Sequence, residues 1–190
     1  MNRLAHPHSS ASPDAALTED LWNGNYTANV SGAGGDTGVA LVEVYDATLP
    51  EYFGASCPRL INLSARTQVG TGADSLIAGF VIGGSAPKTL LIRASGPALK
   101  AFNVAGTLPD PELQVYSTAL GSTLVASNTG WGGDSQVATA AAWAGAFSWG
   151  SSATPDSALL LTLPPGSYTA NVTGASGDTG VALVEIYEVQ

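Results

Sequence analysis

Residues 167–189 read SYTANVTGASGDTGVALVEIYEV, and residues 25–47 read NYTANVSGAGGDTGVALVEVYDA. The two stretches are identical at 17 of 23 positions and lie 142 residues apart. Each alternates apolar and polar residues, passes through a loop of Gly and Asp, and continues as a second strand-like run. We therefore predict a β-hairpin in each copy. A duplication at this spacing is typical of repeat arrays and assembly proteins.

The composition indicates a turn-rich β protein. The 190 residues include 23 Gly and 11 Pro, and charged residues make up only 11%. Fifteen acidic residues against six basic ones give a net charge of −9. A surface with this charge repels nucleic-acid phosphates and anionic lipids, which excludes both as favourable partners. No apolar run approaches the roughly 18 residues of a membrane span, so we expect no membrane insertion.

The second copy closes a series of short strand-like runs with turn signals between them. A spacing near ten residues predicts an all-β fold, an antiparallel β-sandwich or jelly-roll-like domain. We expect an extra N-terminal β-hairpin segment and at most one short helix, over Ser135–Phe147. The expected strands lie within RLINLSARTQV (59–69), LIAGFVIGG (76–84), KTLLIRASG (88–96), ELQVYS (112–117), STLVAS (122–127), ALLLTL (158–163), YTANV (168–172) and GVALVEIYE (180–188).

Four segments follow from this pattern. Residues 1–16 are rich in Pro, Ser and Ala and are expected to form a flexible tail. Residues 17–47 form a partial repeat that acts as a connector hairpin, and residues 48–58 form a linker bounded by prolines. Residues 59–190 form the full β-sandwich repeat. No apolar stretch typical of a secretory signal is visible near Met1, and the sequence does not tell whether Met1 is the natural start.

The partial repeat has lost its leading apolar strand but has kept its hairpin. ALLLTL of the full repeat has become ALTEDL at residues 16–21. A hairpin by itself is marginally stable in water, so residues 25–47 need a partner, either this chain's own sandwich or another chain. The expected assembly residues are the apolar ones of this segment: Tyr26, Val30, Val39, Leu41, Val42, Val44 and Tyr45.

No catalytic constellation is recognisable. The two histidines, His6 and His8, lie in the expected tail, so no base stands near a nucleophile. GGSAPKT (83–89) has Pro87 where a phosphate-binding loop needs a backbone N–H. We therefore expect no enzymatic activity and no cofactor. His6 and His8 could bind a metal only weakly. Calcium is considered at acidic loop residues that include Asp156, with Asp178, Asp36 and Asp134 as weak candidate ligands, because the acidic residues lack EF-hand spacing.

Three tryptophans cluster in the sequence, at Trp131, Trp143 and Trp149. Exposed indole rings could stack on sugars, whereas rings packed under a loop belong to the core. Cys57 stands alone, which excludes an internal disulfide but leaves a buried thiol or a cross-link between chains. Four asparagines begin N-x-S/T sequons, which matter only in a host that glycosylates exported proteins: Asn25, Asn29, Asn62 and Asn171.

Several of these stretches together resemble a repeat module of large exported bacterial proteins, mostly of the cell-surface or extracellular kind. They are RLINLSARTQVGTGADSLIAGFVIGG, KTLLIRASGPAL, NTGWGGD and LPPGSYTANVTGASGDTGVALVEIYE. The resemblance covers residues 59–189 and the hairpin again at 25–47. The closing hairpin is also similar to those of bacterial pre-peptidase C-terminal β-sandwich domains. The resemblance implies an accessory or structural unit and supplies no catalytic residues.

These observations favour an extracellular or cell-surface structural subunit that associates with copies of itself head to tail. The duplicated hairpin would supply strand addition or complementation, and the product would be a fibre. One alternative is a carbohydrate-binding or adhesin module that uses Trp131, Trp143 and Trp149. Another is a monomeric spacer whose hairpin packs on its own sandwich.

Overall fold

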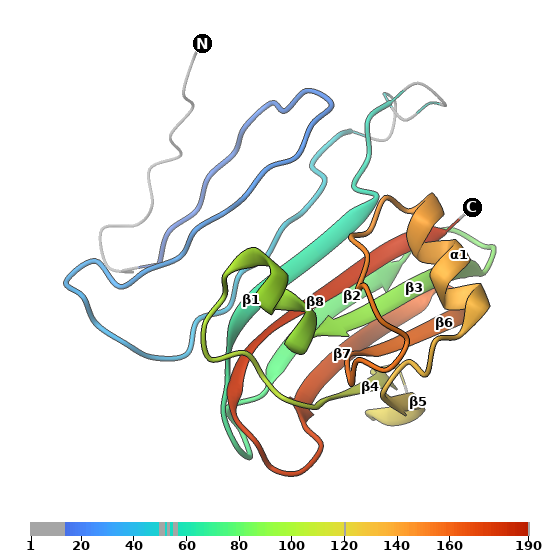
Figure 1. Ribbon diagram of the computed structural model, residues 1–190. Helices are drawn as coiled ribbons and strands as arrows, with labels where there is room; N and C mark the ends of the chain where they lie inside the picture. The colour runs from blue at the N-terminus through green and yellow to red at the C-terminus, as the bar shows by residue number, and fades with distance from the viewer. Residues whose placement is uncertain (1–13, 50–51, 53, 55–56, 120, 190) are drawn as a thin grey trace. The chain divides into compact units, whose positions relative to one another are not determined.

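The computed structural model describes residues 14–49, 52, 54, 57–119 and 121–189. The chain divides into two units, residues 1–60 and residues 61–190. Most of the expected tail (1–16), with His6 and His8, and part of the expected linker (48–58) lie outside the described residues. The second unit contains eight strands: β1 (Asn62–Val69), β2 (Leu76–Ile82), β3 (Lys88–Ser95), β4 (Pro111–Ser117), β5 (Thr123–Thr129), β6 (Ser157–Leu163), β7 (Gly166–Gly174) and β8 (Gly180–Val189) (Figure 1).

The eight strands form two four-stranded sheets that pack as a sandwich. One sheet has the order β1-β8-β3-β6 and the other β2-β7-β4-β5, and every strand pair is antiparallel. The predicted all-β antiparallel sandwich is therefore confirmed. β4 is followed by β5, and the two strands pair with a register shift between Val115 and Tyr116.

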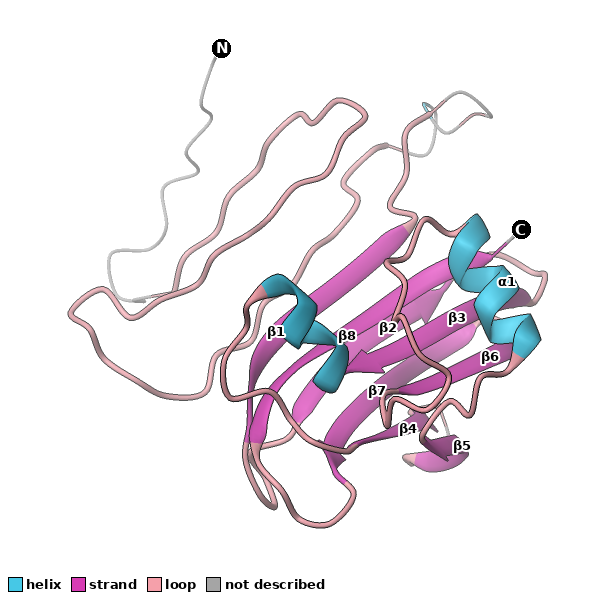
Figure 2. Cartoon of the chain, viewed as in Figure 1, coloured by secondary structure: helices cyan, strands magenta, loops and turns pink. Residues whose placement is uncertain are grey.

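Two short helices accompany the strands (Figure 2). The helix expected over Ser135–Phe147 is present as α1 (Ser135–Trp143), and a 3-10 helix, η2, spans Pro97–Phe102. Asp134 caps α1 by accepting hydrogen bonds from the backbone N–H groups of Gln136 and Val137. The helix stops short because Gly145 takes a φ of +71°, a left-handed conformation that favours glycine and ends a helix.

The core lies between the two sheets, because alternate side chains of each strand point inward. Leu113 and Val115 of β4, Val172 of β7 and Val184 of β8 are fully buried there. Burying a side chain of this size contributes about 1.5–3 kcal/mol. A second, smaller apolar cluster lies between α1 and the outer face of the β3/β6/β8 sheet, and its buried members are Leu91, Val137, Ala140, Ala158 and Tyr187.

The start of β8 leaves no room for a side chain. A Cβ atom on Gly180 would lie 2.5 Å from the backbone nitrogen of Leu108. That close approach is held by the Leu108 N–H, which donates to the Val181 carbonyl over 2.9 Å. In the first copy of the repeat the same position is Gly38, and nothing lies within 4 Å of a Cβ built there. The same residue in the two copies therefore meets two different environments.

We expect Gly180→Ala to lower the free energy of unfolding by about 1–3 kcal/mol, because the added methyl group collides with backbone. Gly38→Ala is the matched control and should change it by less than about 0.5 kcal/mol. Urea unfolding followed by tryptophan fluorescence measures both variants. Equal effects of the two substitutions would contradict the packing described around Gly180.

Candidate functional site

The C-terminal copy of the repeat is a β-arch, in which two successive strands belong to different sheets. β7 lies between β2 and β4, whereas β8 lies between β1 and β3 in the opposite sheet. The predicted hairpin over residues 168–187 is therefore wrong. The loop 175–179 carries the chain from one sheet to the other, so that the apolar sides of both strands face each other across the core. We call residues 167–189 the C-terminal arch and residues 25–47 the N-terminal arch.

The entry into both arches is fixed by the same tyrosine contact. The Tyr168 hydroxyl donates to the carbonyl of Pro164 over 2.9 Å. In the first copy the Tyr26 hydroxyl donates to the carbonyl of Trp22 over 2.8 Å, which is the equivalent position. Because each bond spans four residues, the local sequence alone is sufficient to form it. The N-terminal arch therefore enters its first extended run with the geometry of the C-terminal arch.

The turns of the two arches also match. The Gly177 N–H donates to the Gly174 carbonyl over 3.0 Å, and the Gly35 N–H donates to the Gly32 carbonyl over 3.1 Å. Gly177 has a φ of +76° and Gly35 a φ of +80°, values that glycine adopts without the steric cost of a Cβ. Residues 25–47 accordingly run outward, turn and return (Figure 1). The turn is encoded locally and does not depend on the sandwich.

The N-terminal arch nevertheless forms no strands in the single chain. Within residues 14–49 no residue is assigned to a strand, so the strand pairing expected of a hairpin is not present there. The reason is that β7 and β8 each hydrogen-bond to a neighbour on both sides, and the first copy has no such neighbours among residues 14–49. Strands with unpaired edges are marginal in water.

The apolar side chains of the N-terminal arch are exposed. Val39 is 98% exposed and Tyr45 is 77% exposed. The other predicted assembly residues are exposed as well, namely Tyr26, Val30, Leu41, Val42 and Val44. A contiguous set of exposed apolar side chains is typical of an interaction surface.

The first copy keeps the residues that face the core in the second. The core-facing residues of the C-terminal arch are Tyr168, Ala170, Val172, Ala182, Val184 and Ile186. Their equivalents are Tyr26, Ala28, Val30, Ala40, Val42 and Val44, so a single Ile-to-Val change separates the two sets. The remaining predicted assembly residues, Val39, Leu41 and Tyr45, correspond to the outer face of β8. Residues 25–47 thus carry the side chains of two central sandwich strands, although they form no strands themselves.

A buried ion pair ties the C-terminal arch to its neighbour β3. The guanidinium Nη1 of Arg93 lies 3.5 Å from Oε2 of Glu185, and both side chains are almost completely buried. The hydroxyl of Tyr187 donates to the other carboxylate oxygen of Glu185 over 2.7 Å. Burial raises the pKa of Glu185 and the charge of Arg93 opposes that rise. Burial, followed by the hydrogen bond to Glu185, raises the pKa of Tyr187.

The guanidinium of Arg93 is also enclosed by aromatic rings. Its Cζ lies 4.6 Å from the ring centroid of Phe147 and 4.3 Å from that of Trp149, and Nη2 donates to the Phe147 carbonyl over 2.9 Å. Cation–π contacts of this kind strengthen when the cation is desolvated. No local sequence pattern indicates this cluster, because Arg93, Phe147 and Glu185 come together only in the folded sandwich.

The N-terminal arch repeats the hydrogen bond between tyrosine and glutamate but not the ion pair with arginine. The Tyr45 hydroxyl donates to Oε1 of Glu43 over 2.9 Å, as the equivalent pair does in β8. This hydrogen bond raises the pKa of Tyr45. No described Lys or Arg forms an ion pair with Glu43. The arch therefore presents a carboxylate whose counterpart in the sandwich is paired with an arginine of the adjacent strand.

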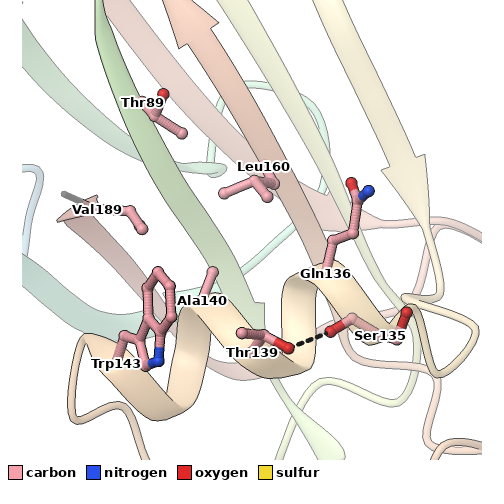
Figure 3. A pocket seen from close by; sticks show the side chains of 8 residues that line it. All are labelled: Thr89, Ser135, Gln136, Thr139, Ala140, Trp143, Leu160 and Val189. Atoms are coloured by element: carbon pink, nitrogen blue, oxygen red, sulfur yellow. Dashed lines mark hydrogen bonds between the residues drawn. The ribbon is translucent and has the colours of Figure 1, made fainter.

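The three tryptophans do not form one surface. Trp131 and Trp149 are half-buried and meet edge to face with ring centroids 5.5 Å apart. The Trp149 indole N–H donates to the Ser95 hydroxyl over 2.8 Å. Trp143 is 74% exposed and borders a shallow hollow between α1, β6 and the end of β8 (Figure 3). Sugar stacking stays a prediction for the three tryptophans. Trp143 is the most exposed of them, and Trp131 and Trp149 pack against the smaller apolar cluster.

The candidate calcium ligands occupy separate structural positions. Asp134 is engaged in capping α1, and Asp178 and Asp36 each lie in the turn of one arch. Within the described part of the chain, no three His, Cys, Asp or Glu side chains gather closely enough to hold a metal ion. Calcium binding stays a prediction without a ligand set. The half-buried thiol of Cys57 donates to the carbonyl of Pro58.

Asp156, one of the acidic loop residues considered for calcium, is the most deeply buried acid among the described residues. It is fully buried and accepts hydrogen bonds from the backbone N–H groups of Gly96 and Ala98 and from the Thr154 hydroxyl. In the sequence it stands in a Thr-Pro-Asp-Ser stretch that reads as an ordinary turn. Thr154 is close in sequence, but Gly96 and Ala98 lie 60 and 58 residues away, so no local pattern signals the burial.

The structure thus defines an all-β sandwich protein in which the sequence of one arch occurs twice. The C-terminal copy is paired within the sandwich, and the N-terminal copy forms no strands. No family model matches the chain, and no curated protein matches it. Among solved structures, the pre-peptidase C-terminal domain of a collagenase from Bacillus anthracis is similar at 10% sequence identity and a TM-score of 0.41, covering 66% of this chain and 89% of that one. This likeness assigns no function here. Among the described residues, no helix is long and apolar enough to cross a membrane.

Proposed function

We propose that this chain is an extracellular, non-enzymatic structural subunit that associates head to tail with copies of itself through residues 17–47. The observation that carries the proposal is the N-terminal arch. It keeps the core-facing residues and the turn geometry of β7 and β8, yet its apolar side chains are exposed and its backbone is unpaired. Because residues 25–47 carry the apolar side chains and the turn of β7 and β8, they are suited to being buried in a contact.

The number of arches in each chain favours docking of the N-terminal arch on a further surface over an exchange of arches between two copies. Each chain holds two arches, but its sandwich has one central place for an arch, and β7 and β8 occupy it. Swapping arches between copies would therefore leave one arch per chain unpaired. The N-terminal arch needs a docking site outside the central place. If that site lies on another copy, the contact joins two different surfaces and can repeat without closing, which produces a fibre.

Burial of the apolar side chains of the arch would favour the free energy of association. Each large apolar side chain of the arch would contribute about 1.5–3 kcal/mol on full burial. Pairing of both extended runs with edge strands would add backbone hydrogen bonds, as in other cases of strand addition. The costs are the ordering of the arch and the loss of free motion of the subunit. The net charge of −9 on each copy also opposes association at low ionic strength.

Deletion of residues 1–50 tests the proposal. The hydrophobic core described above lies entirely within residues 61–190, so the shortened chain keeps every buried core residue. We expect the full chain to form oligomers that grow with concentration and the deletion variant to sediment as a monomer. Sedimentation velocity and electron microscopy at about 0.15 M salt measure this. A variant lacking only residues 1–16 is the control and should still assemble.

Two outcomes would count against the proposal. Oligomers of the same size from the deletion variant would show that residues 17–47 are not the connector. A full chain that stays monomeric at all concentrations would favour the spacer alternative, in which the arch packs on its own sandwich.

A further inference from the structure

We propose that the docking site for the N-terminal arch is the edge formed by β1 and β2 of a second copy of this chain. The proposal rests on the function proposed above and specifies the receiving surface. On docking, residues 38–47 would extend the sheet that β1 borders, and residues 25–32 would extend the sheet that β2 borders. Each four-stranded sheet would then gain a fifth strand.

An arch supplies one strand to each of two facing sheets, so it requires an edge at which one strand of each sheet lies beside the other. The sandwich offers two such edges. β1 and β2 border the two sheets on one side, and β6 and β5 border them on the other. The choice is therefore between the β1/β2 edge and the β5/β6 edge.

Strand direction favours the β1/β2 edge. β8 runs antiparallel to β1, and β7 runs antiparallel to β2. A second arch placed on the outer sides of β1 and β2 in the same orientation keeps both pairings antiparallel. At the other edge β6 runs in the direction of β8, and β5 in the direction of β7. There an arch in the same orientation would pair parallel, and it would pair antiparallel only after a half-turn that reverses the direction of the strand added to each sheet.

The chemistry of the edge strands points the same way. β2 has the sequence LIAGFVI, with no charged residue, no proline and no register shift against its neighbour. Two of its outward-facing side chains, Ile77 and Val81, are 55% and 75% exposed. Natural proteins protect free sheet edges with charges, prolines or bulges. β5 has such a bulge, at the register shift against β4, whereas β2 has none of these protections. β6 has none of them either, so the difference between the two edges lies in β2 and β5.

The core is incompletely covered at both edges, since Leu159 and Leu161 of β6 are also only partly buried. Ala65 of β1 and Phe80 of β2 face the interior but are only partly buried, and Ile61, just before β1, is exposed. In an added arch, Tyr26 and Val30 would face inward on one side and Val42 on the other, as their equivalents do in the C-terminal arch. They would close the open side of the core.

The charges of the two surfaces are complementary. Arg66 is the one charged residue in β1 and β2 together. Residues 25–47 contain Asp36, Glu43 and Asp46 and no Lys or Arg. Because each whole chain carries −9, a contact between an acidic arch and the edge that carries a cation is less unfavourable than a contact between two acidic surfaces.

A single glutamate on either edge tests the assignment in the full chain. Val81→Glu places a negative charge on the outer face of β2, beside the proposed position of the acidic arch, and Leu124→Glu places the same charge on exposed β5 at the other edge. Both side chains are exposed, so both variants should fold, which far-ultraviolet circular dichroism checks. We expect Val81→Glu to raise the concentration for half-maximal association at least about tenfold, and Leu124→Glu to leave it within about twofold.

The outcomes separate this inference from the proposed function. Loss of assembly on Leu124→Glu with normal assembly of Val81→Glu would overturn the β1/β2 edge in favour of β5/β6. Normal assembly of both variants would overturn the assignment to either edge. In each case the proposed function stands if deletion of residues 1–50 still abolishes assembly, and it fails if that deletion variant assembles.

Discussion

Replacing Arg93 with alanine is expected to lower the free energy of unfolding of the sandwich by about 3–5 kcal/mol, the usual cost of removing one partner of a buried ion pair. The substitution leaves the Glu185 carboxylate buried without its cation. It also removes the contacts of the guanidinium with Phe147 and Trp149 and its hydrogen bond to the Phe147 carbonyl. Arg66→Ala, on exposed β1, is the matched control, with an expected change under about 0.5 kcal/mol.

The loss caused by Arg93→Ala should depend on pH. Burial already raises the pKa of Glu185, and without Arg93 that pKa rises further. A carboxyl whose pKa is higher in the folded than in the unfolded state favours folding at low pH. This contribution to stability is lost as the pH rises above 4.5, the ordinary pKa of a glutamate carboxyl. The variant should therefore be penalised more at pH 8 than at pH 5. Urea unfolding at the two pH values measures this, and an equal penalty at both would contradict the buried, unpaired carboxylate.

Replacing Asp156 with alanine is expected to cost about 3 kcal/mol, because buried donors left without an acceptor bear their full desolvation penalty. The carboxylate accepts from the N–H groups of Gly96 and Ala98 and from the Thr154 hydroxyl, and Gly96 leads into η2. Its loss should loosen the connection between β3 and η2 as well as the entry to β6.

The control for Asp156 is an acid of the same type on the surface. Asp178 lies exposed in the turn of the C-terminal arch, so Asp178→Ala should change the free energy of unfolding by much less. Asp156→Asn tests the charge separately, because the amide keeps one acceptor oxygen. Thermal unfolding of the three variants gives the order expected, with Asp156→Ala least stable. Similar stability of Asp156→Ala and Asp178→Ala would contradict the role given to the buried carboxylate.

Some of the fold followed directly from local patterns. Tyr168, Ala170 and Val172 alternate with polar residues, which predicted a strand with one buried face, and the structure buries all three in the core. The Ala-rich stretch before Gly145 predicted a short helix, and α1 lies there. The conformations of the two arch turns are also local, since the same hydrogen bond forms in both copies of the repeat.

The candidate site was predictable only in part. The duplication identified residues 25–47 and their apolar side chains, and the role of residues 17–47 as a connector stays a proposal. The difference between a hairpin and an arch could not be read from either copy. A Gly- and Asp-rich loop can join two strands of one sheet or cross between two sheets, and the local sequence permits both.

By itself, therefore, the sequence determined where strands and turns form and that one pair of strands occurs twice, because these depend on residues close together in the chain. Only the tertiary structure decided that β7 and β8 belong to opposite sheets, because that choice depends on pairing with β1 to β4, which lie far away in sequence. The same holds for Arg93 and Glu185, whose charges meet across 92 positions of the chain. Hydrogen bonds and ion pairs between distant strands are fixed by the assembled sheets, and no local pattern encodes them.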